Sequence, residues 1–154
     1  MNLRAAIAKF RKKKTTETFL ARQLVRHEGL RLYPYKDTKG KLTIGVGRNI
    51  EDNGINEQEA MYMLENDIER SRKELENNLP FFNTLNKARQ DVLINMCFNM
   101  GITSFLEFEK TFEYIEAGDF EAASIEMLDS KWAKKDVGES RSNELSQQMK
   151  TGVR

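Results

Sequence analysis

The stretch RHEGLRLYPYKDTKGKLTIGVG, Arg26 to Gly47, combines a helix end, a hairpin and three candidate catalytic side chains. Apolar residues of the segment before it, Thr15 to Arg26, recur at helical spacing. Gly29 suits the position that follows a helix, so we expect the helix to end at Glu28. A carboxylate in a last helical turn lies at the negative end of the helix dipole. This position disfavours the charged form of the carboxylate, as a general acid requires.

The second half of this stretch predicts a β-hairpin. Asp37 begins Asp-Thr-Lys-Gly, a sequence typical of a type I turn. The following residues, Lys41 to Gly47, alternate between apolar side chains and polar or glycine positions. Thr43 is therefore expected on the face away from the small apolar cluster, where the neighbouring glycines leave room for a ligand chain.

Each candidate also has a simpler explanation. Glu28 can be a solvated residue at a helix end, Asp37 a turn residue, and Thr43 an ordinary strand residue. Their combination favours catalysis, because glycosidic hydrolysis requires two carboxylates that flank one cleft.

The sequence resembles the lysozymes of the T-even phage type, a family of phage endolysins with muramidase activity. The matching blocks are Glu28-Gly29-Leu30-Arg31-Leu32, Tyr35-Lys36-Asp37-Thr38 with Thr43-Ile44-Gly45-Val46-Gly47, then Leu93 to Gly101, and Ser130-Lys131-Trp132. In order along the chain, they extend the resemblance over roughly residues 17 to 152.

The resemblance implies an α+β, mainly helical, lysozyme-like fold. We expect a basic N-terminal extension at residues 1–14 and a single catalytic domain at 15–154. Within that domain, the resemblance implies an N-lobe with a β-hairpin sheet at about 15–56. A long connecting helix would follow at about 57–79, and a helical C-lobe at about 80–154.

The implied activity is hydrolysis, with inversion, of the β-1,4 bond between N-acetylmuramic acid and N-acetylglucosamine in bacterial peptidoglycan, causing host lysis. Glu28 would act as general acid, Asp37 as general base or electrostatic stabiliser, and Thr43 would position water. No metal or organic cofactor is expected. The resemblance also places five residues at substrate-contact positions: Asn49, Phe98, Thr111, Glu126 and Arg141. Two rival functions are a lytic transglycosylase and a non-catalytic cell-wall-binding module of a phage particle.

Two positions depart from the family pattern. Arg48 stands where the family commonly has a histidine, and we expect this change to alter a local ion pair more than catalysis. Glu126 stands where the family has an amide, which puts that substrate contact in question.

Local signals predict the remaining elements. Turn residues predict a loop at Arg48 to Ile55. Asn56 and Glu59 form a capping-box pattern at the start of a helix that reaches Leu79. Three further helices are expected at Asn86 to Met100, Phe105 to Glu116 and Phe120 to Ser130, with Cys97 in the core and Trp132 anchoring the last helices.

Charge is distributed unevenly along the chain. Residues 1–48 hold 13 Lys and Arg against three acids, hence +10, while residues 49–154 hold 12 against 21, hence −9. The basic half suits an anionic partner, although two oppositely charged lobes that attract one another across the cleft would explain the same pattern. Met1 to Lys14 is either a solvated leader or a short amphipathic helix that binds anionic membrane or lipopolysaccharide.

The sequence also bounds partners and localisation. Met1 to Lys14 lacks the features of a secretory signal, so we expect synthesis in the host cytoplasm and action on the periplasmic wall after passage through the membrane. No motif for nucleic-acid binding is found, and a monomer is expected.

Overall fold

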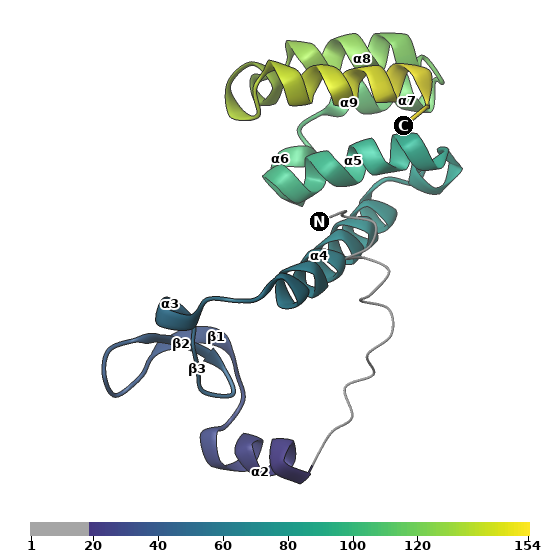
Figure 1. Cartoon of the computed structure of the whole chain (residues 1–154). Helices are drawn as coiled ribbons and strands as arrows, with labels where there is room; N and C mark the ends of the chain where they lie inside the picture. The colour runs from purple at the N-terminus through teal and green to yellow at the C-terminus, as the bar shows by residue number, and fades with distance from the viewer. Residues whose placement is uncertain (1–18) are drawn as a thin grey trace. The chain divides into compact units, whose positions relative to one another are not determined.

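The computed structural model describes residues 19–154 and falls into two compact units, which divide in sequence between Glu65 and Asn66. The basic extension expected at Met1 to Lys14 lies outside the described residues. In the first unit (Figure 1) the elements are α2 (Phe19–Glu28), β1 (Arg31–Lys36), β2 (Leu42–Gly45), β3 (Arg48–Asn49), α3 (Ile50–Asn53) and the start of α4 (Glu57–Asn78). The second contains the rest of α4, η1 (Phe82–Thr84), α5 (Lys87–Met100), α6 (Ile102–Phe105), α7 (Glu109–Glu116), α8 (Phe120–Asp129), η2 (Trp132–Asp136) and α9 (Glu139–Thr151). The expected α+β, mainly helical class is confirmed.

Helix α2 ends at Glu28, as the sequence predicts. The Gly29 N–H donates to the Val25 carbonyl at 2.9 Å, and Gly29 has φ of 76°, a conformation that glycine adopts without strain. The helix buries none of its side chains, and Phe19 is 78% exposed.

The sheet of the first unit is antiparallel, with strand order β1-β2-β3. The predicted turn joins β1 to β2, and the Gly40 N–H donates to the Asp37 carbonyl at 2.9 Å. Pro34 lies in β1, an edge strand, where the pairing register shifts between Arg31 and Tyr35. An edge strand tolerates proline because it can leave one side of its backbone unpaired.

The loop expected at Arg48 to Ile55 is wrong, because this segment forms β3 and α3. Asn49 is the N-cap of α3, and its side-chain Oδ1 accepts the Asp52 N–H at 3.0 Å. Gly54 follows the helix with φ of 56°. The polar residues that suggested a loop are therefore the cap and the end of a single helical turn.

The capping box at the start of α4 is confirmed. Asn56 Oδ1 accepts the Glu59 N–H at 2.9 Å, and Glu59 Oε2 accepts the Asn56 N–H at 2.8 Å. The second carboxylate oxygen of Glu59 accepts from Arg48 Nη1 at 2.7 Å, and Arg48 Nε donates to the Gly54 carbonyl at 2.9 Å. Arg48 thus forms the local ion pair that links β3 to α4.

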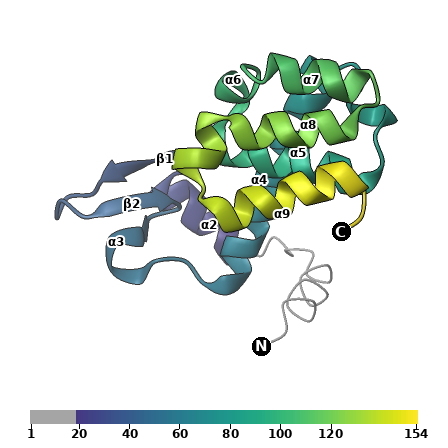
Figure 2. The ribbon, with the colours of Figure 1, turned by 90° about the horizontal axis from the view of Figure 1, so that it is seen from above.

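The hydrophobic core lies in the second unit. Among the described residues, every buried hydrophobic side chain comes from Leu75 or later in the chain. Helix α5 occupies the range that the sequence predicts, with Cys97 only 1% exposed. Helix α8 packs against both α7 and α9, as Figure 2 shows. No helix within residues 19–154 has the length and apolar character to cross a membrane.

The single helix expected at Phe105 to Glu116 is wrong at its start, because α6 ends at Phe105 and α7 begins at Glu109. The Phe105 ring packs on Phe108 and Phe112, with centroid distances of 6.1 and 5.2 Å. The break between the helices lets Phe108 join this aromatic contact.

A π-helical turn, η2, follows α8. The Val137 N–H donates to the Trp132 carbonyl five residues earlier, at 3.1 Å. Such turns are rare and frequently accompany functional sites. Trp132 is buried as expected, with its ring against Phe108 and its Nε1 donating to Asn99 Oδ1 at 3.0 Å.

Candidate active site

Glu28 and Gly47 lie in close contact in the first unit. A Cβ built on Gly47 would be 3.3 Å from Glu28 Oε2 and 3.6 Å from its Cβ and Cγ. Gly47 also has φ of 71°. The glycine therefore provides both a left-handed backbone and space for the Glu28 side chain, which is exposed at the end of α2.

Asp37 is held by the backbone of its own turn. Its Oδ1 accepts the Lys39 and Lys41 N–H groups, each at 2.8 Å, while the Asp37 N–H donates to the Lys41 carbonyl at 3.0 Å. Within the described chain, Asp37 Oδ2 accepts no hydrogen bond. One oxygen thus orients the carboxylate, and the other is left for a different partner.

Thr43 occupies the central strand of the sheet, opposite Tyr35 on one side and Asn49 on the other. Its hydroxyl donates to the Lys41 carbonyl at 3.2 Å, and the residue is only 2% exposed. The expectation of an open face with room for a ligand chain is therefore not met at Thr43. Thr43 is the one buried residue of β2, and its neighbours in the strand are half-buried.

An ion-pair network braces the hairpin that carries Asp37. Lys41 Nζ lies 2.9 Å from Asp52 Oδ1 and 3.3 Å from Glu51 Oε1, and Glu51 Oε2 accepts the Leu42 N–H at 3.0 Å. The hydrogen bond to Asp52 raises the pKa of Lys41. The Leu42 N–H and Lys41 lower the pKa of Glu51, and Lys41 also lowers the pKa of Asp52.

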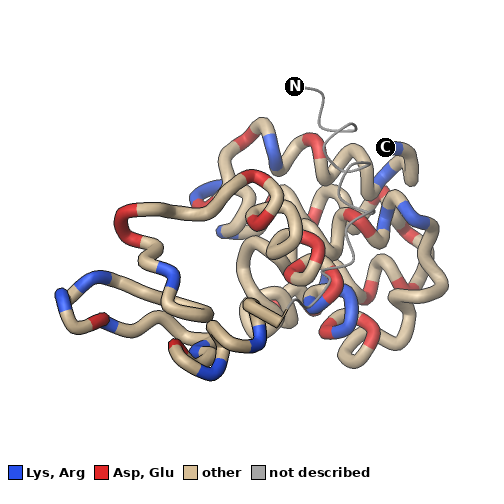
Figure 3. The backbone as a smooth tube through the Cα atoms, turned by 60° about the horizontal axis from the view of Figure 1, so that its bottom comes forward, with Lys and Arg blue, Asp and Glu red and all other residues tan. Residues whose placement is uncertain are grey.

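These contacts partly neutralise the basic first half of the chain. Lys36 and Lys41 contact α3 acids, and Arg48 contacts Glu59. Figure 3 shows positive and negative positions interspersed along the described chain. These ion pairs join basic residues before position 49 to acids after it, all within the first unit.

Two of the predicted substrate contacts, Asn49 and Arg141, have other partners in the structure, and a third, Phe98, lines a cavity. The Asn49 side chain caps α3 and also donates to Asp52 Oδ2 at 2.9 Å. Arg141 on α9 donates to Asn95 Oδ1 on α5, at 2.6 Å from Nη2. Phe98 is 46% exposed and lines a cavity of about 460 Å³ between α4, α5 and α6.

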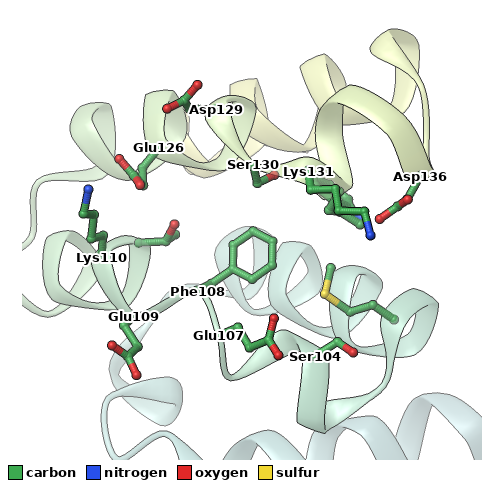
Figure 4. Close-up of a pocket in the computed structure, with 13 residues that line it drawn as sticks. Ser104, Glu107, Phe108, Glu109, Lys110, Glu126, Asp129, Ser130, Lys131 and Asp136 are labelled. Carbon is green, nitrogen blue, oxygen red and sulfur yellow. The ribbon is translucent and has the colours of Figure 1, made fainter.

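The structure brings Thr111 and Glu126 together at one pocket of about 580 Å³. Figure 4 shows the pocket between the α6–α7 segment and the α8–η2 segment, with Phe108 pointing into the space. The sequence prediction missed the other charged residues that line it: Glu107, Glu109, Lys110, Asp129, Lys131 and Asp136.

Within residues 19–154, no three His, Cys, Asp or Glu side chains are arranged to hold a metal ion. The first unit presents two candidate catalytic carboxylates: Glu28 at a helix end, and Asp37 fixed on one oxygen.

The chain belongs to the phage lysozyme family, whose model matches residues 25–149. The family resemblance inferred from the sequence is thereby confirmed.

The chain is similar to curated proteins of two kinds, a phage spike protein and probable lysozymes. The chain is 31% identical over 147 residues to the pre-baseplate central spike protein Gp5 of Enterobacteria phage T4, covering 77% of this chain and 26% of that protein. It is 31% identical over 135 residues to the probable T4-type lysozyme 2 of Dictyostelium discoideum, covering 68% of this chain and 79% of that protein. The probable T4-type lysozyme 1 of the same organism is 29% identical over 155 residues, covering 82% and 90%. The chain thus spans about a quarter of the spike protein's length and most of each amoebal lysozyme.

Proposed function

We propose that the protein is a muramidase that hydrolyses the β-1,4 bond between N-acetylmuramic acid and N-acetylglucosamine in bacterial peptidoglycan. The main support is the carboxylate arrangement of the first unit in a chain of the phage lysozyme family. Asp37 is oriented by two backbone N–H groups on one oxygen, and Glu28 is exposed at a helix end beside Gly47. Glycosidic hydrolysis requires two carboxylates with distinct surroundings.

The two carboxylates are assigned different roles. Glu28, which has no charged partner within 4 Å among the described residues, donates a proton to the leaving glycosidic oxygen. Asp37 is assigned the second role, because its Oδ1 is held by two backbone N–H groups and its Oδ2 has no hydrogen-bond partner among the described residues. Asp37 activates the attacking water and offsets oxocarbenium charge, which gives inversion at the anomeric carbon.

Thr43 is assigned an indirect role that suits its burial. Its hydroxyl proton is committed to the Lys41 carbonyl, so its oxygen is left to accept a hydrogen bond from water. Thr43→Val tests this role, because valine keeps the shape and removes the acceptor. We expect a lower turnover rate with little change in the Michaelis constant.

The decisive experiment is mass spectrometry of the fragments released from purified peptidoglycan. The wild type should release muropeptides with reducing ends, and both Glu28→Gln and Asp37→Asn should lose this activity by at least about 100-fold. Glu113→Gln, which removes an exposed acid on α7, is the matched control and should keep it. Anhydro products that survive Asp37→Asn would establish a lytic transglycosylase instead.

The match to a spike protein favours a second candidate, a wall-binding module of a larger particle. This function needs affinity for peptidoglycan but not both carboxylates. Sedimentation with insoluble peptidoglycan separates the two. Wild-type protein that co-sediments without releasing any fragments would support the binding module and contradict the muramidase.

A further inference from the structure

Helix α3 begins where strand β3 ends, and this change leaves one backbone group of β2 without a partner from β3. The register pairs Thr43 with Asn49, and the next residue, Ile50, already belongs to α3. Strand β3 therefore ends before it can pair with Leu42. Glu51 of α3 supplies the acceptor instead, because its Oε2 accepts the Leu42 N–H at 3.0 Å. In Figure 1, α3 lies against the sheet beside β2.

The peptide group that Glu51 contacts is also bonded to Asp37 and Thr43. The Leu42 N–H and the Lys41 carbonyl belong to one planar peptide unit and point in opposite directions. This carbonyl accepts the Asp37 N–H at 3.0 Å and the Thr43 hydroxyl at 3.2 Å. The Lys41 N–H in turn donates to Asp37 Oδ1 at 2.8 Å. A rotation of this peptide plane would therefore displace the Asp37 carboxylate and the Thr43 hydroxyl together.

Glu51 also contacts side chains on both sides of the turn that carries Asp37. Its Oε2 lies 3.6 Å from Nζ of Lys36, the last residue of β1, and its Oε1 lies 3.3 Å from Nζ of Lys41, just before β2. The Leu42 N–H and Lys41 lower the pKa of Glu51, so the carboxylate is ionised near neutral pH. A hydrogen bond to an ionised acceptor is stronger than one to a neutral acceptor.

The backbone contact distinguishes Glu51 from its neighbour Asp52. The Asp52 carboxylate accepts from the side chains of Lys41 and Asn49, but it accepts from no backbone N–H in the described part of the chain. The Glu51 and Asp52 side chains are 43% and 50% exposed. Because ion pairs of this exposure contribute little to stability, the bond to the Leu42 N–H is the contact that sets Glu51 apart.

We propose that Glu51 is a positioning residue for glycosidic hydrolysis. Through the Leu42 N–H it fixes the peptide group that holds both Asp37 and Thr43. The inference rests on the proposed function, in which Asp37 activates the attacking water. The property that the reaction requires of Glu51 is its hydrogen-bond acceptor, and its charge has a secondary effect.

Three variants separate the acceptor from the charge. Glu51→Ala removes both, and Glu51→Gln removes the charge but keeps an oxygen that can accept the Leu42 N–H. Asp52→Asn is the matched control, because it removes a charge beside the same Lys41 side chain and leaves the Leu42 bond intact.

Turnover is measured on soluble peptidoglycan fragments, at a temperature where circular dichroism shows every variant to be folded. We expect Glu51→Ala to lower the turnover rate about tenfold with the Michaelis constant within about twofold of wild type, because a misplaced catalytic group slows the chemical step. Glu51→Gln and Asp52→Asn should stay within about threefold of the wild-type rate. Equal rates in Glu51→Ala and wild type would overturn the proposal. Equal losses in Glu51→Ala and Glu51→Gln would overturn the role of the acceptor.

Amide hydrogen exchange, followed by NMR on the full chain, tests the same link without catalysis. The Leu42 and Lys41 amides should exchange at least about fivefold faster in Glu51→Ala, because loss of the acceptor increases local opening. Asp52→Asn should leave both rates unchanged, and the amides of α5 report any change in global stability. An unchanged Lys41 rate in Glu51→Ala would overturn the proposal, because the effect of Glu51 would then stop short of Asp37.

The two proposals fail in different ways. If the wild type releases no reducing fragments, the muramidase proposal fails, whatever the exchange rates show. If the wild type and Glu51→Ala cut peptidoglycan at the same rate, only the role of Glu51 is refuted.

Discussion

Gly47→Ala tests whether the position of Glu28 controls activity. The substitution has two effects. An alanine at φ of 71° is strained by roughly 1–2 kcal/mol, and its Cβ would lie 3.3 Å from Glu28 Oε2. The carboxylate is the flexible end of a side chain, so it moves by a few tenths of an ångström. We expect turnover on peptidoglycan to fall about tenfold, since small displacements of a catalytic group have large effects on rate.

Gly45→Ala is the matched control for this prediction. Gly45 has φ of 69°, but a Cβ there meets nothing within 4 Å. Both variants should therefore lose a similar amount of stability, with melting temperatures lower by about 2–8 °C, measured by circular dichroism. Only Gly47→Ala should lose activity beyond what unfolding explains. Equal activities at equal melting temperatures would refute the role of the Glu28 contact.

Three further predictions concern stability and reactivity. Leu93→Ala should lower the free energy of unfolding by about 2–5 kcal/mol in chemical denaturation, because Leu93 is fully buried, and a loss below about 1 kcal/mol would contradict the core assignment. In the folded protein the pKa values of Glu51 and Asp52 lie below their ordinary values of 4.5 and 3.8. The two carboxylates therefore stabilise the folded state at a pH above the ordinary values, and this stabilisation is lost as the pH falls through the lowered folded-state pKa values. The melting temperature should therefore fall more steeply with acid in the wild type than in Lys41→Met. Burial raises the pKa of Cys97 to about 11. At pH 8 a disulfide reagent should therefore react slowly with the Cys97 thiol of the native protein and rapidly with the thiol of the denatured protein. Rapid labelling of Cys97 in the native protein would exclude a buried thiol.

Elements with local signals could be predicted from the sequence. The end of α2 depends on Gly29, the hairpin on the turn from Asp37 to Gly40, and the start of α4 on the capping box of Asn56 and Glu59. In each case the residues that specify the structure are within four positions of one another. The hydrogen bonds that define these features form within the same short segment, so the local residue pattern is sufficient to predict them.

Features that depend on distant packing could not be predicted in this way. The helix break before α7 coincides with the aromatic contact between Phe105 and Phe108, and neither helical spacing nor a turn residue marks it in the sequence. The alternation around Thr43 predicts an open face with room for a ligand chain, whereas the residue is 2% exposed. The shared pocket of Thr111 and Glu126 arises because α7 and α8 pack together, and the family resemblance named both residues without showing that they meet.

The absence of buried hydrophobic side chains before Leu75 in the described chain has a consequence for synthesis. The ribosome delivers the segment with Glu28 and Asp37 first and the core-forming segment last, at about 5–20 residues per second. Until α5, α8 and α9 have emerged, the nascent chain has no buried core to stabilise a folded state. The proposed catalytic acids therefore exist for several seconds on a nascent chain whose hydrophobic core has not yet formed.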